Sequence, residues 1–199
     1  MKKIVTLLVV LMTLPMMGQD FKIGLSVAPT FNFNKHSAKD TNGNYQTIGT
    51  AKGTGWKGGA VVDYAFAGNY YLHSGLLIHQ KVATLNDVKL KTTTIEIPLA
   101  VKLISNEFTS GMAISATFGG TFDLNVSGKS IVNDVETDVS SDINTFGFSF
   151  VTGLGVIYDL GFGSLDAGLS YHLGLTDVSK GGDTIITPKH LAVDLKFYF

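Results

Sequence analysis

The stretch that decides the fold is the last one in the chain, 189-KHLAVDLKFYF-199. From Leu191 to Phe199 every second residue is apolar, and Asp194 and Lys196 lie between the apolar positions. This period of two indicates a β-strand, because successive side chains of a strand point to opposite faces. One face of the strand is wholly apolar, while the other carries both an acid and a base.

The same stretch resembles the carboxyl-terminal signal of Gram-negative outer-membrane β-barrels, in which a final Phe follows alternating apolar residues. The resemblance implies recognition by the barrel-assembly machinery during insertion. It also implies that the other strands alternate in the same way, with short turns at one end of the barrel and longer loops at the other.

Seven further segments show this alternation. Strands are predicted at 21–33, 56–66, 70–81, 92–103, 111–127, 146–159 and 164–174, before the terminal strand. Long polar loops are predicted at 34–55, 82–91, 128–145 and 175–188, and short turns at 67–69, 104–110 and 161–163. Eight strands with long and short connections in strict alternation predict an all-β fold, an eight-stranded antiparallel up-and-down transmembrane β-barrel.

The alternation also predicts which side chains face lipid and which face the lumen. Glu96, Asp166 and Lys196 should point inward. The expected lipid-facing set includes Leu25, Val62, Ile97, Ile114, Val156, Val193 and Leu195. Pro98 conflicts with its strand because it has no N–H to donate, so we expect a bulge or a broken ladder bond there.

Aromatic residues gather at both ends of the predicted strands, as the interfacial girdles of a membrane barrel do. The short-turn end carries Tyr64, Phe66, Tyr70, Tyr158, Phe197 and Phe199, and the long-loop end carries Phe31, Phe33, Trp56, Phe146 and Phe148.

The amino-terminal segment has a different character. Lys2 and Lys3 precede an apolar run over residues 4–17, which indicates a secretory signal peptide at 1–18 and a barrel domain at 19–199. The run is shorter than the ~20 residues that a membrane-spanning helix needs. The alternative is a membrane-anchoring or buried helix.

Composition narrows the class of protein. Only 16% of residues are charged and the formal net charge is −1, so no basic surface indicates nucleic acid as a partner. The chain has no cysteine, which excludes disulfides and a lipid anchor on an amino-terminal cysteine. We therefore expect the barrel itself to attach the protein to the membrane. The predicted location is the outer membrane, and the predicted partner is its lipid.

Several segments together resemble the PorT-like outer-membrane β-barrel family. They are 74-SGLL-77 before Gln80 and Lys81, 95-IEIPL-99, 153-GLG-155, 169-LSY-171 with Gly174 and Leu175, and the terminal strand. The resemblance implies an eight-stranded barrel in the outer membrane. The founding member of the family is linked to a secretion apparatus. This sequence contains no identifiable interaction motif that would support the same role.

The predicted lumen is rich in ionisable residues of both signs. Its members are Lys22, Asp63, His73, His79, Glu96, Lys102, Asp123, Asp166, His172, Asp194 and Lys196. Eight strands enclose a space that side chains just fill. We therefore interpret the lumen as a network of ion pairs and hydrogen bonds, with a proton path or narrow pore as the alternative.

No catalytic residue, cofactor-binding residue or metal-ligating motif is predicted. Ser170 lies between Asp166 and His172 on one strand face, but Asp166 and His172 are separated by ~20 Å along that strand. Cross-strand partners remain open as a way to assemble a site. The acidic loop with Asp134, Glu136, Asp138 and Asp142 lacks the glycine and terminal glutamate of a calcium loop.

The predicted function is that of an integral outer-membrane β-barrel protein without enzymatic activity. It has a side-chain-filled lumen and a structural or interaction role through its extracellular loops. One alternative is a narrow pore or a component of a secretion apparatus. The other is a secreted soluble β-barrel that turns its apolar faces inward and binds a small apolar ligand.

Overall fold

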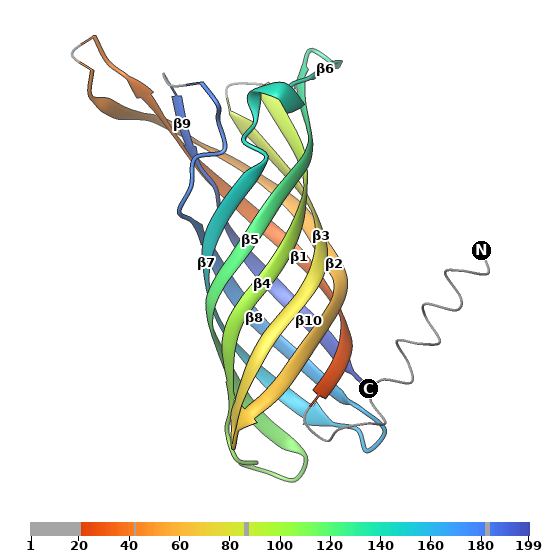
Figure 1. Cartoon of the computed structure of the whole chain (residues 1–199). Coiled ribbons are helices and arrows are strands. Elements are labelled where there is room, and N and C mark those ends of the chain that lie inside the picture. The colour runs from red at the N-terminus through yellow and green to blue at the C-terminus, as the bar shows by residue number, and fades with distance from the viewer. Residues whose placement is uncertain (1–20, 42, 86–87, 182–183) are drawn as a thin grey trace.

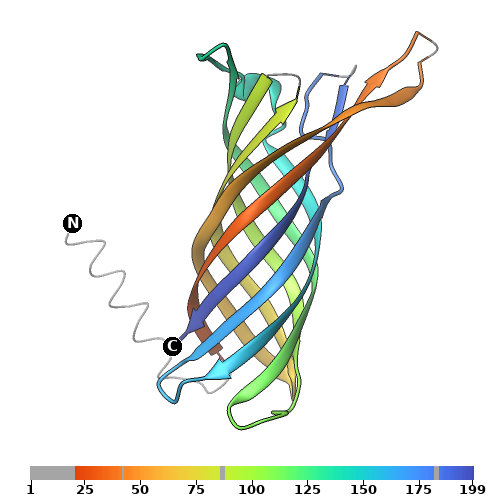
Figure 2. The same cartoon turned by 180° about the vertical axis from the view of Figure 1, so that it is seen from behind.

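The computed structural model describes residues 21–41, 43–85, 88–181 and 184–199. These residues form an antiparallel sheet that is rolled into a closed, tilted barrel (Figures 1 and 2). The strands are β1 (Phe21–Lys39), β2 (Tyr45–Ala67), β3 (Tyr70–Leu85), β4 (Val88–Ile104), β5 (Met112–Val132), β6 (Val135–Asp138), β7 (Phe146–Asp159), β8 (Ser164–Gly174), β9 (Thr184–Thr187) and β10 (Lys189–Tyr198), with one 3₁₀ turn, η2 (Ser140–Asp142). The predicted signal peptide and the start of the barrel domain near residue 19 lie outside the described residues.

The barrel closes between its first and last long strands. β1 pairs antiparallel with β2 on one side and with β10 on the other, where Leu25 lies opposite Phe197 and Thr30 opposite Ala192. Eight long strands make the ring, while β6 and β9 are short additions that pair with β5 and β1 at the long-loop end. The predicted fold is confirmed. No helix in the described ranges is long and apolar enough to cross a membrane.

The long loops contain more strand than the sequence predicts. Residues 34–55 were predicted to be an exposed loop, but the β1–β2 ladder runs through them from Asn34 opposite Ala51 to Lys39 opposite Tyr45. This prediction was wrong because a hairpin surrounded by water satisfies its backbone by pairing and needs no apolar face to do so. Figure 1 shows this extension projecting beyond the rim. The predicted loops at 82–91, 128–145 and 175–188 also contain parts of β3, β4, β5, β6 and β9.

Side-chain orientation follows the predicted alternation. Leu25 is 58% exposed and Leu195 45%, whereas Glu96 and Asp166 are each 1% exposed. The apolar faces therefore point out of the barrel and the charged faces into it, and the soluble barrel with an apolar interior is wrong. The buried apolar cluster that the structure describes is small, consisting of Val61, Leu77 and Tyr198.

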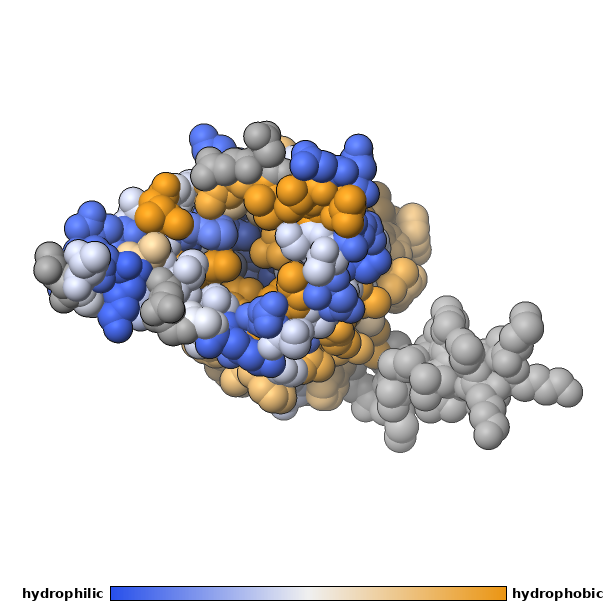
Figure 3. Space-filling model, turned by 90° about the horizontal axis from the view of Figure 1, so that it is seen from above, coloured by the Kyte–Doolittle hydropathy of each residue, from blue (hydrophilic) through white to orange (hydrophobic). Residues whose placement is uncertain are grey.

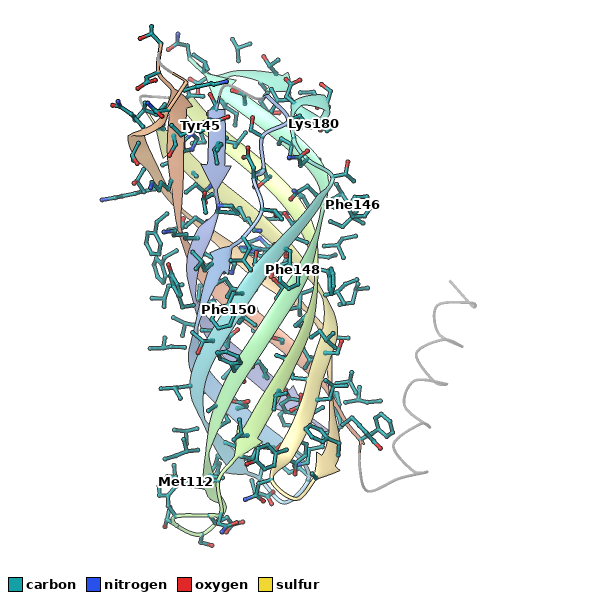
Figure 4. All side chains as sticks on the ribbon, turned by 60° about the vertical axis from the view of Figure 1, so that its left-hand side comes forward. Tyr45, Met112, Phe146, Phe148, Phe150 and Lys180 are labelled. Carbon is teal, nitrogen blue, oxygen red and sulfur yellow. The ribbon has the colours of Figure 1, made fainter. Side chains whose placement is uncertain are left out.

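Exposed aromatic rings lie near both ends of the outer wall. Phe146 projects from β7 near the long-loop end (Figure 4), and Trp56 on β2 is 48% exposed. At the short-turn end the rings of Tyr64 and Phe21 are tilted against each other with their centroids 4.6 Å apart, and Phe199 is 60% exposed. This placement fits two interfacial girdles.

Pro98 interrupts a ladder, as its missing N–H requires. On the β3 side, pairs are present at Ser74 with Leu99 and at Leu77 with Glu96, but none is present at Pro98. The register is unchanged across this gap, and the Ser74 hydroxyl donates to the Pro98 carbonyl at 2.8 Å. The broken ladder bond is thus confirmed.

Candidate functional site in the barrel lumen

The lower layer of the lumen is organised around Lys102. Its ammonium group lies 2.8 Å from Asp63 Oδ2 and 2.7 Å from Asp166 Oδ2, and it donates to the Tyr198 hydroxyl at 3.2 Å. His73 Nδ1 contacts Asp63 at 2.5 Å from the other side. Both carboxylates are almost fully buried, so their charges are balanced inside the barrel rather than by solvent.

Two other lysines of the predicted lumen lie farther from this centre. Lys196 reaches Asp166 at 3.9 Å. Lys22 instead lies 5.2 Å above the ring of Tyr71 and joins no ion pair of this layer within the described part of the chain. The predicted ion pairing of the lumen is confirmed for Lys102 and Lys196.

The upper layer of the lumen contains two lysines and three acids, and two of the acids pair with a lysine. Glu96 Oε1 contacts His79 Nδ1 at 2.5 Å and Lys81 Nζ at 3.2 Å. Lys57 lies 2.9 Å from His172 Nε2 and 3.8 Å from Asp194. In the same layer the Ser149 hydroxyl donates to Asp123 at 2.7 Å.

Three histidine rings are in contact in this layer. His190 is parallel to His172 at 4.1 Å and edge-on to His79 at 4.7 Å between ring centroids. The predicted lumen omitted Lys57, Lys81 and His190. Their signal was present in the sequence, because each falls on the polar phase of its strand.

The Ser170, His172 and Asp166 set does not form a catalytic triad. Asp166 lies in the lower layer with Lys102, as its separation along the strand predicted. Ser170 Oγ donates to Asp194 at 2.5 Å and lies 3.3 Å from His172 Nε2. An orienting acid would have to bind His172 Nδ1, yet that nitrogen has no partner among the described residues.

The acidic extracellular segment is used for local pairing. Lys129 and Glu136 form an exposed ion pair at 2.8 Å across the β5–β6 hairpin, and the hydrogen bond from Lys129 lowers the pKa of Glu136. The Asp138 carboxylate accepts the Ser140 N–H at 2.8 Å, which lowers the pKa of Asp138. These acids bind their own hairpin and turn rather than converging on one point.

The space left beside the two charged layers is small, whereas a wider hollow of about 300 Å³ lies at the long-loop end among His36, Ala51, Ala83, Leu85, Val88 and Leu90. An internal cavity of about 50 Å³ borders Glu96, Thr121, Asp166 and His172. Such a volume holds a few water molecules and no larger solute. At the level of the two charged layers the lumen is therefore a packed polar interior.

An apolar outer wall, a closed ring of eight tilted strands and a buried polar interior define an outer-membrane β-barrel. Residues 17–180 match the family model described as "Outer membrane protein beta-barrel domain". The chain belongs to this family, and its location is the outer membrane.

Two solved structures show the same fold. Neisserial surface protein A is 13% identical with a TM-score of 0.51, and the match covers 88% of this chain and 97% of that one. The outer membrane protein OprG from Pseudomonas aeruginosa is 13% identical with a TM-score of 0.54, over 90% of this chain and 95% of that one. No characterised protein matched this chain by sequence.

Proposed function

We propose that this protein is a non-conducting, non-enzymatic barrel that anchors a set of extracellular hairpins in the outer membrane. The observation that carries the proposal is the bridge across the lumen, in which Lys102 of β4 joins Asp63 of β2 to Asp166 of β8. An ion that crossed the barrel would have to break these buried contacts. The side chains therefore act as a plug.

In this proposal the interaction with other proteins takes place at the long-loop end, which faces the cell exterior in outer-membrane barrels. Seen from above, the projecting β1–β2 hairpin and much of the rim are hydrophilic (Figure 3). The hairpin carries Lys35, Lys39 and Lys52, whereas the segment around β6 carries the acids Asp134, Glu136, Asp138 and Asp142. Two hairpins of opposite charge suit recognition of another protein by charge complementarity.

The finer assignment to the PorT-like subfamily is also part of the proposal, supported by 95-IEIPL-99 and the other segments quoted above. The proposed partners are outer-membrane lipid around the apolar wall and the barrel-assembly machinery during insertion. A role in a secretion apparatus would be one form of the hairpin interaction.

Single-channel recording of the purified barrel in a planar bilayer tests the plug. We expect no stable openings, and large ion-selective openings would replace this proposal with the pore.

A photo-crosslinking residue at Ile48, which is 60% exposed on the hairpin, tests the interaction role in intact cells. The matched control is Phe108, 58% exposed in the opposite turn. We expect a protein adduct from position 48 and none of the same size from position 108. The absence of any adduct from position 48 would contradict the interaction role.

A further inference from the structure

The most unusual part of the lumen is the place where His79 of β3, Glu96 of β4 and His190 of β10 meet. Each residue offers one possible ligand atom, and the three atoms lie within 4.8 Å of one another. All three side chains are buried, with at most 4% exposure. His79 and Glu96 come from neighbouring strands, but His190 comes from a strand far away in sequence, which explains why no ligand motif is visible along the chain.

The polar atoms around this point are short of partners. Glu96 Oε2 and His190 Nε2 are buried and accept or donate no hydrogen bond among the described residues, and the same holds for His172 Nδ1. Buried polar groups are nearly always paired, so several unpaired atoms in one place point to a missing partner.

The unpaired atoms also indicate the charge of that partner. Asp123 lies directly opposite Glu96 on the β4–β5 ladder, and both side chains are buried. Like charges opposite each other repel, and Asp123 Oδ1 is unpaired as well. Lys81 contacts Glu96 at Oε1, whereas Oε2 has no hydrogen-bond partner among the described residues, so a cation beside that oxygen would complete the site.

The donor types select the ion. Two imidazoles and one carboxylate form a donor set that zinc and neighbouring divalent transition metals bind, whereas magnesium and calcium prefer oxygen ligands alone. A metal–ligand bond of ~2.1 Å in tetrahedral geometry sets donor atoms ~3.4 Å apart, so side-chain rotation must bring the three atoms closer. The Thr30 hydroxyl, 3.0 Å from His79 Nε2, can rotate away to release that nitrogen.

We propose that the barrel binds one divalent transition-metal ion of the zinc type inside its lumen, through His79, Glu96 and His190. A water molecule from the adjacent cavity, which borders Glu96, would occupy the fourth coordination position of the ion. The site lies above the Lys102 layer and does not depend on the hairpin interaction.

The test uses tag-free barrel that is stripped with a chelator, refolded in detergent and dialysed against Zn²⁺. We expect elemental analysis to find one zinc ion per folded barrel, released when the pH is lowered because the histidine ligands must be unprotonated. His190→Gln should weaken zinc binding by at least ~10–100-fold, since even losses outside the ligand shell have effects of that size. His36→Gln, on the extracellular end of β1, is the matched control and should bind as the wild type does.

Cobalt provides a readout that does not need a variant. Co²⁺ bound to the wild-type barrel should give the intense visible absorption of a tetrahedral site, and added Zn²⁺ should remove it. The inference is overturned if the folded wild type holds no zinc after dialysis, or if folded His190→Gln holds as much as the wild type. If His190→Gln does not fold, the cobalt experiment on the wild type decides. The proposed site is overturned if Co²⁺ mixed with the wild-type barrel shows only the weak absorption of hydrated Co²⁺.

Discussion

Replacing Lys102 with Met tests whether the lumen is a dry ionic plug. Lys102 holds two carboxylates at 2.7 and 2.8 Å, and its ammonium lies 4.5 Å from the centre of the Tyr198 ring. Methionine keeps most of the chain length, so the substitution removes the charge and leaves little cavity. Any loss of stability then reports the uncompensated Asp63 and Asp166.

The expected magnitude follows from the burial of both acids. Breaking a buried ion pair by removing one partner costs ~3–5 kcal/mol. His73 at 2.5 Å from Asp63 and Lys196 at 3.9 Å from Asp166 remain as partial partners. We therefore expect the lower part of that range, about 3 kcal/mol, or a fall of ~100-fold in the ratio of folded to unfolded protein.

Urea unfolding in lipid vesicles measures this loss, and the single tryptophan of the chain, Trp56 on the outer wall, is the fluorescence reporter. Lys129→Met is the matched control, because its ion pair with Glu136 is exposed and should not move the midpoint measurably. A second check combines Lys102→Met with Asp63→Asn and Asp166→Asn, which removes the three charges of the bridge and should restore most of the stability. A loss below about 1 kcal/mol in the single variant would refute the dry plug and indicate a lumen screened by water.

The remaining predictions concern the outer wall, the chain end and an extracellular hairpin. Because the chain has no cysteine, Leu195→Cys introduces a single thiol, which should resist a membrane-impermeant thiol reagent in intact membranes. The control Ser141→Cys, in an exposed turn, should react, and equal labelling of the two variants would contradict lipid exposure at position 195. Phe199→Ser should lower the amount of heat-modifiable folded barrel in cells but leave refolding into detergent nearly unchanged, because the Phe199 side chain is largely exposed. An equal loss in both assays would mean that Phe199 contributes to stability rather than to recognition by the assembly machinery. The pKa of Glu136 is lowered in the folded hairpin, so its stabilisation is present above its ordinary value of 4.5 and is lost as the pH falls through the lowered pKa. The protection factors of the β6 amides, which correct for the intrinsic pH dependence of exchange, should therefore fall in acid for the wild type. Glu136→Gln should abolish that fall, and an unchanged fall would point to Asp138 instead.

The sequence by itself determined the barrel and the direction of its side chains. In a membrane, the alternation seen at Leu195 and Lys196 follows from the two media that a strand separates. Lipid accepts only apolar side chains, whereas the lumen can hold charges that pair. The same constraint made the break at Pro98 predictable. Each of these properties depends on neighbours along the chain or on the medium around the strand.

Only the tertiary structure decided which inward residues meet and how far the strands extend. Contacts such as Lys57 with Asp194, or His79 with His190, join strands far apart in sequence and depend on the stagger of the whole ring, which no local pattern encodes. The sequence also did not predict that the β1–β2 hairpin continues past Asn34. Outside the membrane both faces of a strand meet water, so backbone pairing continues while the apolar signal that marks a strand disappears.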